Sequence, residues 1–228
     1  MFYFDQYYLI LVVPALLLSV IAQISVKATF SKYSEIRNRH GITGAEAAAS
    51  VLKINGIRDV SIAPVQGSLT DHYDPSSKTL RLSGPVYRET SIAAVGVAAH
   101  EAGHAIQHAK SYAPLVLRST LVPVANLGSS LGPYIALSGI FFRLPILLNL
   151  GIVLFGAAVA FYLITLPVEI DASRRALAHL ERNAILSPEE MTGAKKVLTA
   201  AAFTYVASAL TAVASLARII LLSRDRRN

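Results

Sequence analysis

The fold is decided by a run without a charged residue, 146–166, which reads ILLNLGIVLFGAAVAFYLITL. A helix needs about 20 consecutive apolar residues to cross the hydrocarbon core of a bilayer, so this run predicts a membrane-spanning helix. The composition agrees, because hydrophobic residues make up 54% of the 228 residues and charged residues only 15%. An ordinary soluble domain carries roughly 25% charged residues. A disordered chain and an ordinary soluble globule are therefore disfavoured.

The chain contains no cysteine. This excludes a disulfide scaffold, a thiolate zinc site, an iron–sulfur cluster and a cysteine nucleophile, so a metal site must use His, Asp or Glu. The net charge of +7 is compatible with nucleic-acid binding. The basic residues, however, follow the ends of apolar runs and form no stripe with interleaved aromatic residues, as is typical of membrane flanks. We expect a lipid bilayer as partner and no nucleic acid.

We expect five segments along the chain. The first apolar run is interpreted as an uncleaved helix and not as a signal peptide, because basic residues follow it and none precedes it. The segments are a transmembrane helix (1–26), a soluble insert (27–110), a transmembrane hairpin (111–167), a second, helical soluble insert (168–199) and a membrane helix with a basic tail (200–228).

Short elements are expected within the soluble-looking part. Thr43 and Glu46 have the spacing of a capping box that opens a helix ending near Lys53. Residues 60–65 and Thr79–Ser83 are predicted strands, separated by a polar loop at 69–78, and a helix is predicted from about residue 91 to 110.

The motif His100-Glu101-Ala102-Gly103-His104 lies on that last helix. Residues four apart lie on one helix face, about 6 Å apart along the axis, so both imidazoles can bind one zinc ion. Glu101 is then placed to act as general base on a zinc-activated water. The alternative is three polar residues on an exposed helix face, which the apolar run 92–99 before the motif disfavours.

The third ligand is expected to be Glu169. His108 lies about 12 Å from His100 along a straight helix, too far for both to bind one ion, so it is interpreted as a helix-end or supporting residue. A membrane hairpin returns the chain to the side it left, and Glu169 follows Pro167, where the span is expected to end. The alternative is that Glu169 is a charge at the start of a helix.

Asp171 is two positions beyond Glu169, roughly 200° around a helix, so both carboxylates cannot face the metal. Asp171 is expected to pair with Arg174 or Arg175, which follow it by three and four residues.

Four stretches together resemble the bacterial membrane zinc metallopeptidases of the YugP type, over nearly the whole chain. They are LTDHYDP (69–75), LRLS (80–83), AAHEAGHAIQ (98–107) and PVEIDASRRA (167–176). The resemblance implies a neutral zinc peptidase in the cytoplasmic membrane. The layout is also similar to that of HtpX-type and prenyl-protein proteases, in which a membrane hairpin separates HExxH from a Glu that begins an E-x-x-x-D-like motif. Here Ser173 stands at the fourth position after Glu169, so Ser173 or Asp171 would take the place of that Asp in orienting a ligand histidine.

The oxyanion of the transition state needs a donor, for which His, Tyr or Arg serves. His72 and Tyr73 are candidates, together with Tyr87, His179 and the Arg174–Arg175 pair, and the sequence does not separate them. Alternatively, residues 71–75 only form a turn. The strand Thr79–Ser83 is expected either to be an edge strand that pairs with an extended peptide or to be covered by its own hairpin partner.

These observations predict a mainly α membrane protein of about four membrane helices, with a small α+β, zincin-like (gluzincin-like) catalytic region containing a short β-hairpin. The expected function is that of a zinc endopeptidase with one Zn²⁺ on His100, His104 and Glu169, acting on peptides or membrane proteins. The alternative is a non-catalytic membrane scaffold or chaperone-like protein with a structural zinc site. An intramembrane protease of the site-2 type is less favoured, because the motif helix follows a polar segment and no second intramembrane Asp occurs.

The expected location is the bacterial cytoplasmic membrane, with several spans. Segments 27–110 and 168–199 carry 10 and 5 Lys and Arg residues, which predicts a cytoplasmic active site. The arginines at 224, 226 and 227 contradict this orientation, because a spanning last helix would place them outside, unless that helix is interfacial or half-inserted.

Overall fold

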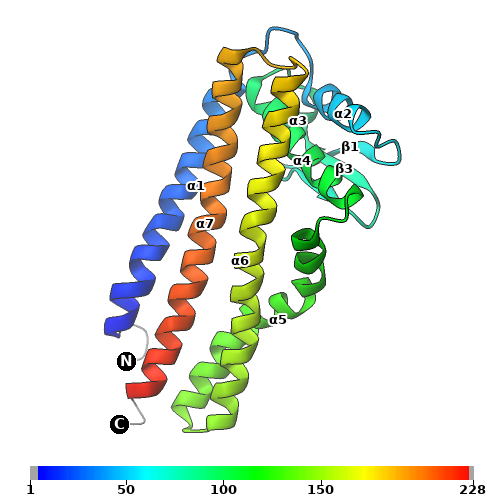
Figure 1. Cartoon of the computed structure of the whole chain (residues 1–228). Coiled ribbons are helices and arrows are strands. Elements are labelled where there is room, and N and C mark those ends of the chain that lie inside the picture. Colours follow the sequence, from blue (N-terminus) through cyan, green and yellow to red (C-terminus); the bar gives the residue numbers. More distant parts are fainter. Residues whose placement is uncertain (1–4, 226–228) are drawn as a thin grey trace. The chain divides into compact units, whose positions relative to one another are not determined.

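The computed structural model describes residues 5–225 and is mainly helical (Figure 1). The elements in chain order are a π-helical turn (Tyr8–Val12), α1 (Val13–Ser34), α2 (Gly44–Ile54), β1 (Ser61–Val65), β2 (His72–Asp74), β3 (Thr79–Ser83), α3 (Gly84–Arg88), α4 (Ile92–Ala109), α5 (Ala113–Phe141), α6 (Pro145–Arg182) and α7 (Pro188–Asp225). They form two compact units. The helical unit comprises Met1–Gln23, Val116–Pro167 and Phe203–Asn228, and the mixed unit comprises Ile24–Leu115 and Val168–Ala202.

Three of the described helices are long and apolar enough to cross a membrane: Tyr8–Ser34, α6 and α7. A fourth span, in the region of α5, stays a prediction. Pro167 was expected to end the second helix of the hairpin, and this is wrong, because α6 continues through it to Arg182. Proline removes one backbone donor from the helix, a loss that apolar helices packed on neighbours tolerate.

Helices α1 and α7 lie side by side and antiparallel in the helical unit (Figure 1). Before α1, Asp5 Oδ2 accepts hydrogen bonds from Arg218 Nε at 2.9 Å and from the Arg218 terminal nitrogen at 2.6 Å. Further along α1, the Ser19 and Thr211 hydroxyls are 3.0 Å apart. The C-terminal part of α7 therefore runs along α1 and not across it. Of the predicted basic tail, residues 226 and 227 lie outside the described part of the chain.

Helices α5 and α6 form a hairpin whose backbones are in direct contact. A Cβ atom on Gly128 would lie 2.1 Å from the Leu154 carbonyl oxygen, and one on Gly151 would lie 2.2 Å from the Ala136 nitrogen. Only glycine fits such an approach, so small residues let the two helices pack closely.

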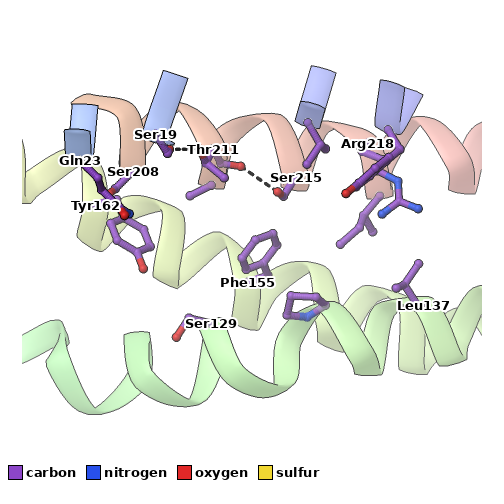
Figure 2. A pocket seen from close by; sticks show the side chains of 15 residues that line it. Ser19, Gln23, Ser129, Leu137, Phe155, Tyr162, Ser208, Thr211, Ser215 and Arg218 are labelled. Atoms are coloured by element: carbon purple, nitrogen blue, oxygen red, sulfur yellow. Dashed lines mark hydrogen bonds between the residues drawn. The ribbon is translucent and has the colours of Figure 1, made fainter. Parts of the chain in front are cut away.

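A cavity of about 460 Å³ lies in the helical unit, lined by residues of α1, α5, α6 and α7 (Figure 2). Several hydroxyl groups face it, but most donate to carbonyl oxygens of their own helix. Ser208 donates to Thr204 and Ser215 donates to Thr211. Local hydrogen bonds of this kind satisfy polar groups where a bilayer supplies no water.

The mixed unit is built on a three-stranded sheet of order β1-β3-β2. Strand β1 is parallel to β3, with Ile62 opposite Leu80, whereas β2 is antiparallel to β3, with Tyr73 opposite Leu80. Leu80 and Leu82 of β3 are fully buried in a core shared with α2 and α4. The capping box of Thr43 and Glu46 at the start of α2 is confirmed.

The structure corrects the prediction for residues 69–78. Instead of a loop only, this segment contains β2, which pairs with β3 as a hairpin. Strand β3 is therefore central and has both edges occupied, so the expectation that Thr79–Ser83 is an edge strand for a substrate is wrong. The three residues of β2 are too few to show an alternating pattern, and hydrogen bonds from Ser83 to Asp71 help hold this segment against β3.

The close packing of α5 on α6 predicts opposite effects for two glycines of α6. Gly151→Ala should lower the thermal-unfolding midpoint in detergent, because overpacking costs about 1–3 kcal/mol. Gly156→Ala is the matched control, because a Cβ there meets no atom of the described chain within 4 Å. It should keep or raise the midpoint, since alanine favours a helix over glycine. Equal midpoints for the two variants would contradict the close contact.

Candidate metal centre

The site rests on the contact of α4 with the part of α6 that follows Pro167. A Cβ on Gly103 would lie 2.6 Å from the Ala172 carbonyl oxygen, so the two backbones touch at this point. Helix α4 is almost entirely buried and begins at the N-cap Ser91, whose side chain accepts from the Ala94 backbone. This packing places the first residues after Pro167 opposite the HExxH motif.

Three side chains of types that bind metals converge there. His100 Nε2 is 3.3 Å and His104 Nε2 is 3.5 Å from Glu169 Oε2. The three donor atoms lie within 4.8 Å of one another and form the one such group of His, Cys, Asp and Glu among the described residues. Tetrahedral zinc with bonds of about 2 Å has ligand atoms roughly 3.3 Å apart, so two imidazoles and a carboxylate in this arrangement fit zinc.

The charge of the group also favours a cation. Glu169 is 2% exposed and His104 is 8% exposed. Burial lowers the pKa of His104, but the hydrogen bond and charge of Glu169 raise it by more, so this pKa lies above its ordinary value. A buried carboxylate requires compensation, which a proton on His104 provides without a metal and a divalent cation would provide with one.

The outer nitrogen of each histidine has a partner as well. His100 Nδ1 is 3.0 Å from Ser173 Oγ, and His104 Nδ1 is 3.0 Å from Gln107 Oε1. Gln107 in turn reaches Asp171. Such contacts orient ligand imidazoles. Ser173 thus contacts His100 directly, whereas Asp171 reaches His104 only through another residue.

The sequence analysis missed Gln107. Its spacing was the available signal, because it follows His104 by three residues and so lies on the same face of α4. The residue type predicts no role at a metal site, because an amide is not a zinc ligand.

Glu101 is buried, with 7% of its surface exposed. No hydrogen bond joins its carboxylate to another residue of the described chain. It adjoins His100 on α4, about 100° around the helix from it. A carboxylate so placed is available to accept a proton.

The remaining candidates lie elsewhere or have other partners. His72 is exposed, and its Nδ1 lies 2.8 Å from the Thr70 carbonyl oxygen. The Tyr73 hydroxyl is 2.8 Å from His108 Nδ1. Neither makes a described hydrogen bond to the three donors, and His108 is not in their group.

The expected pairing of Asp171 is confirmed. Its two oxygens accept from Arg174 at 2.6 Å and from Arg175 Nε at 2.5 Å. Both arginines are therefore engaged with Asp171.

The comparisons with known proteins agree with this chemistry. The profile of a family described as "Putative neutral zinc metallopeptidase" matches residues 8–224. A curated relative from Bacillus subtilis (strain 168), named "Putative membrane protease YugP", is 47% identical over 221 residues, which cover 97% of this chain and 98% of the relative. No solved structure matches the chain.

The geometry predicts which substitutions remove the metal. His100→Ala, His104→Ala and Glu169→Ala should each lose stoichiometric zinc, measured by elemental analysis of the purified protein. His108→Ala is the matched control, because it removes a histidine one turn further along α4, and it should retain zinc. Retention of zinc by Glu169→Ala together with its loss in Asp171→Ala would show that the third ligand is misassigned.

Proposed function

We propose, since the chain belongs to the family of neutral zinc metallopeptidases, that it is an integral-membrane zinc endopeptidase with Glu101 as general base. The observation that carries the proposal is the convergence of His100, His104 and Glu169 next to Glu101, whose carboxylate makes no hydrogen bond to another residue of the described chain. Three protein donors would leave a fourth position for water on a bound zinc ion, as in catalytic zinc sites.

The chain's own residues suit peptide hydrolysis. His100, His104 and Glu169 would hold the metal, which when bound lowers the pKa of a coordinated water towards neutrality. Glu101 then accepts a proton as the water oxygen attacks the carbonyl carbon of the peptide bond. The same carboxyl group returns this proton to the leaving nitrogen as the C–N bond breaks.

The alternative is a membrane scaffold in which zinc is structural. A structural site is usually closed by four protein ligands, whereas this group has three. A structural role also gives no function to Glu101, which adjoins His100 and makes no hydrogen bond through its carboxylate to another residue of the described chain. The endopeptidase proposal explains both features.

The proposed location of the chemistry is the cytoplasmic surface of the membrane. Glu169 follows the charge-free run 146–166 by three residues, which supports a site at the boundary and not at mid-bilayer. The basic residues of 27–110 and 168–199 support the cytoplasmic side. Substrates would be flexible segments of peptides or membrane proteins near that surface.

The mechanism predicts that Glu101→Gln separates metal binding from catalysis. The amide is nearly isosteric and the three ligands remain, so this variant should retain stoichiometric zinc. Hydrolysis of casein should fall by 10²–10⁴-fold or more, because the general base is lost. Substantial peptidase activity in this variant would refute the mechanism, and loss of zinc would mean that Glu101 is itself a ligand.

The topology is testable because the chain lacks cysteine, so single cysteines can be labelled cleanly. In intact cells, Ser77→Cys and Pro188→Cys should be protected from a membrane-impermeant thiol reagent. Phe142→Cys, in the turn between α5 and α6, is the control and should be labelled. Ready labelling at residues 77 and 188 with protection at residue 142 would reverse the proposed orientation.

A further inference from the structure

The side chain of Gln107 is fully buried between α4 and α6. Its nitrogen donates to the Val168 carbonyl oxygen at 2.8 Å and to Asp171 Oδ2 at 3.0 Å. Its oxygen lies 3.0 Å from His104 Nδ1. All the hydrogen-bonding atoms of this amide are thus engaged.

These three partners are compatible with only one orientation of the Gln107 amide group. A backbone carbonyl and a carboxylate only accept hydrogen bonds, so the NH₂ group must face Val168 and Asp171. The amide oxygen then faces His104, and because this oxygen only accepts, His104 Nδ1 must carry a proton and donate it. The lone pair of the neutral imidazole is consequently on Nε2, the atom that faces Glu169.

Asp171 is itself held in place. Arg174 and Arg175 donate to its two oxygens, and the residue is 4% exposed. Its oxygen therefore stays beside the Gln107 nitrogen. Removal of this acceptor would free the amide to rotate.

We propose that Gln107 and Asp171 are positioning residues, which set the tautomer and ring orientation of His104 for metal binding through Nε2. The proposal rests on the proposed zinc site. His100 provides a contrast. Its partner, the Ser173 hydroxyl, can either donate or accept a hydrogen bond and so does not impose a tautomer on His100. The two ligand histidines are supported unequally, and the support of His104 is the stricter one.

The competing explanation is that Gln107 only joins the two helices. Gln107→Met keeps the approximate shape but no hydrogen bond, and Asp171→Leu removes the acceptor. If these residues position His104, both should weaken zinc affinity by 10–100-fold in competition with a chromophoric chelator. The absorption spectrum of the cobalt-substituted protein should change as well. Asp171→Asn should restore affinity to within a few-fold of wild type, because its amide oxygen can still accept from Gln107.

Ile106→Val is the matched control for stability, since Ile106 is the buried neighbour of Gln107 on α4. It should lower the unfolding midpoint and leave zinc affinity unchanged. Ser173→Ala should weaken zinc binding less than Gln107→Met does. Zinc affinity and a cobalt spectrum like those of wild type in folded Gln107→Met would overturn the proposal, and so would equal effects of Asp171→Leu and Asp171→Asn.

A measurement on the wild type needs no variant to fold. In zinc-loaded protein with ¹⁵N-labelled histidine, the nitrogen shifts should show two metal-bound imidazoles, each protonated at Nδ1 and coordinated through Nε2. Coordination of His104 through Nδ1 would overturn the proposal while leaving the zinc site intact. A wild type that binds no zinc would instead overturn the proposed function, and this inference with it.

Discussion

The candidate site depends on the backbone contact between α4 and α6 at Gly103 and Ala172. Any side chain at position 103 would prevent this contact, because its Cβ would lie 2.6 Å from the Ala172 carbonyl oxygen. The second of the two residues between Glu101 and His104 is thus a packing residue as well as a spacer. At a larger helix separation, the Glu169 carboxylate would not lie 3.3 and 3.5 Å from the two imidazoles.

Placing so many polar groups in this contact is costly unless each finds a partner. Asp171 is matched by two arginines, Gln107 uses both ends of its amide, and Ser173 meets His100. Glu169 is compensated by the two histidines and, in the proposed enzyme, by the metal. Glu101 differs, because its carboxylate makes no hydrogen bond to another described residue, yet its oxygens are not among the buried atoms that lack a partner. In the proposed enzyme, this carboxylate would accept a proton from the reacting water.

The sheet constrains how a substrate could bind. With β1 and β2 on either side of β3, main-chain pairing is restricted to the outer edges of the sheet. Strand β1 carries Pro64, which lacks a backbone donor. Strand β2 lies against α4 through the hydrogen bond of Tyr73 with His108. Tyr73, a candidate oxyanion donor from the sequence, thus has His108 as a partner near the end of α4.

The sequence by itself determined the local features. A run without charge indicates a membrane span, a capping box indicates the start of a helix, and two histidines four residues apart indicate a shared helix face. Each of these signals depends only on residues close together in the chain. The position of Glu169 near the two histidines could also be predicted, because a hairpin brings the chain back to the side of the membrane that it left. The continuation of α6 through Pro167, the strand β2 inside a polar segment and the bridge of Gln107 to Asp171 were decided only by the tertiary structure. The continuation of α6 and the bridge of Gln107 depend on the packing of α4 on α6, two segments distant along the chain, whereas β2 depends on pairing with β3 a few residues later. The local sequence does not indicate these contacts, because they involve a helix breaker, a strand of only three residues and an amide that has no metal-binding chemistry of its own.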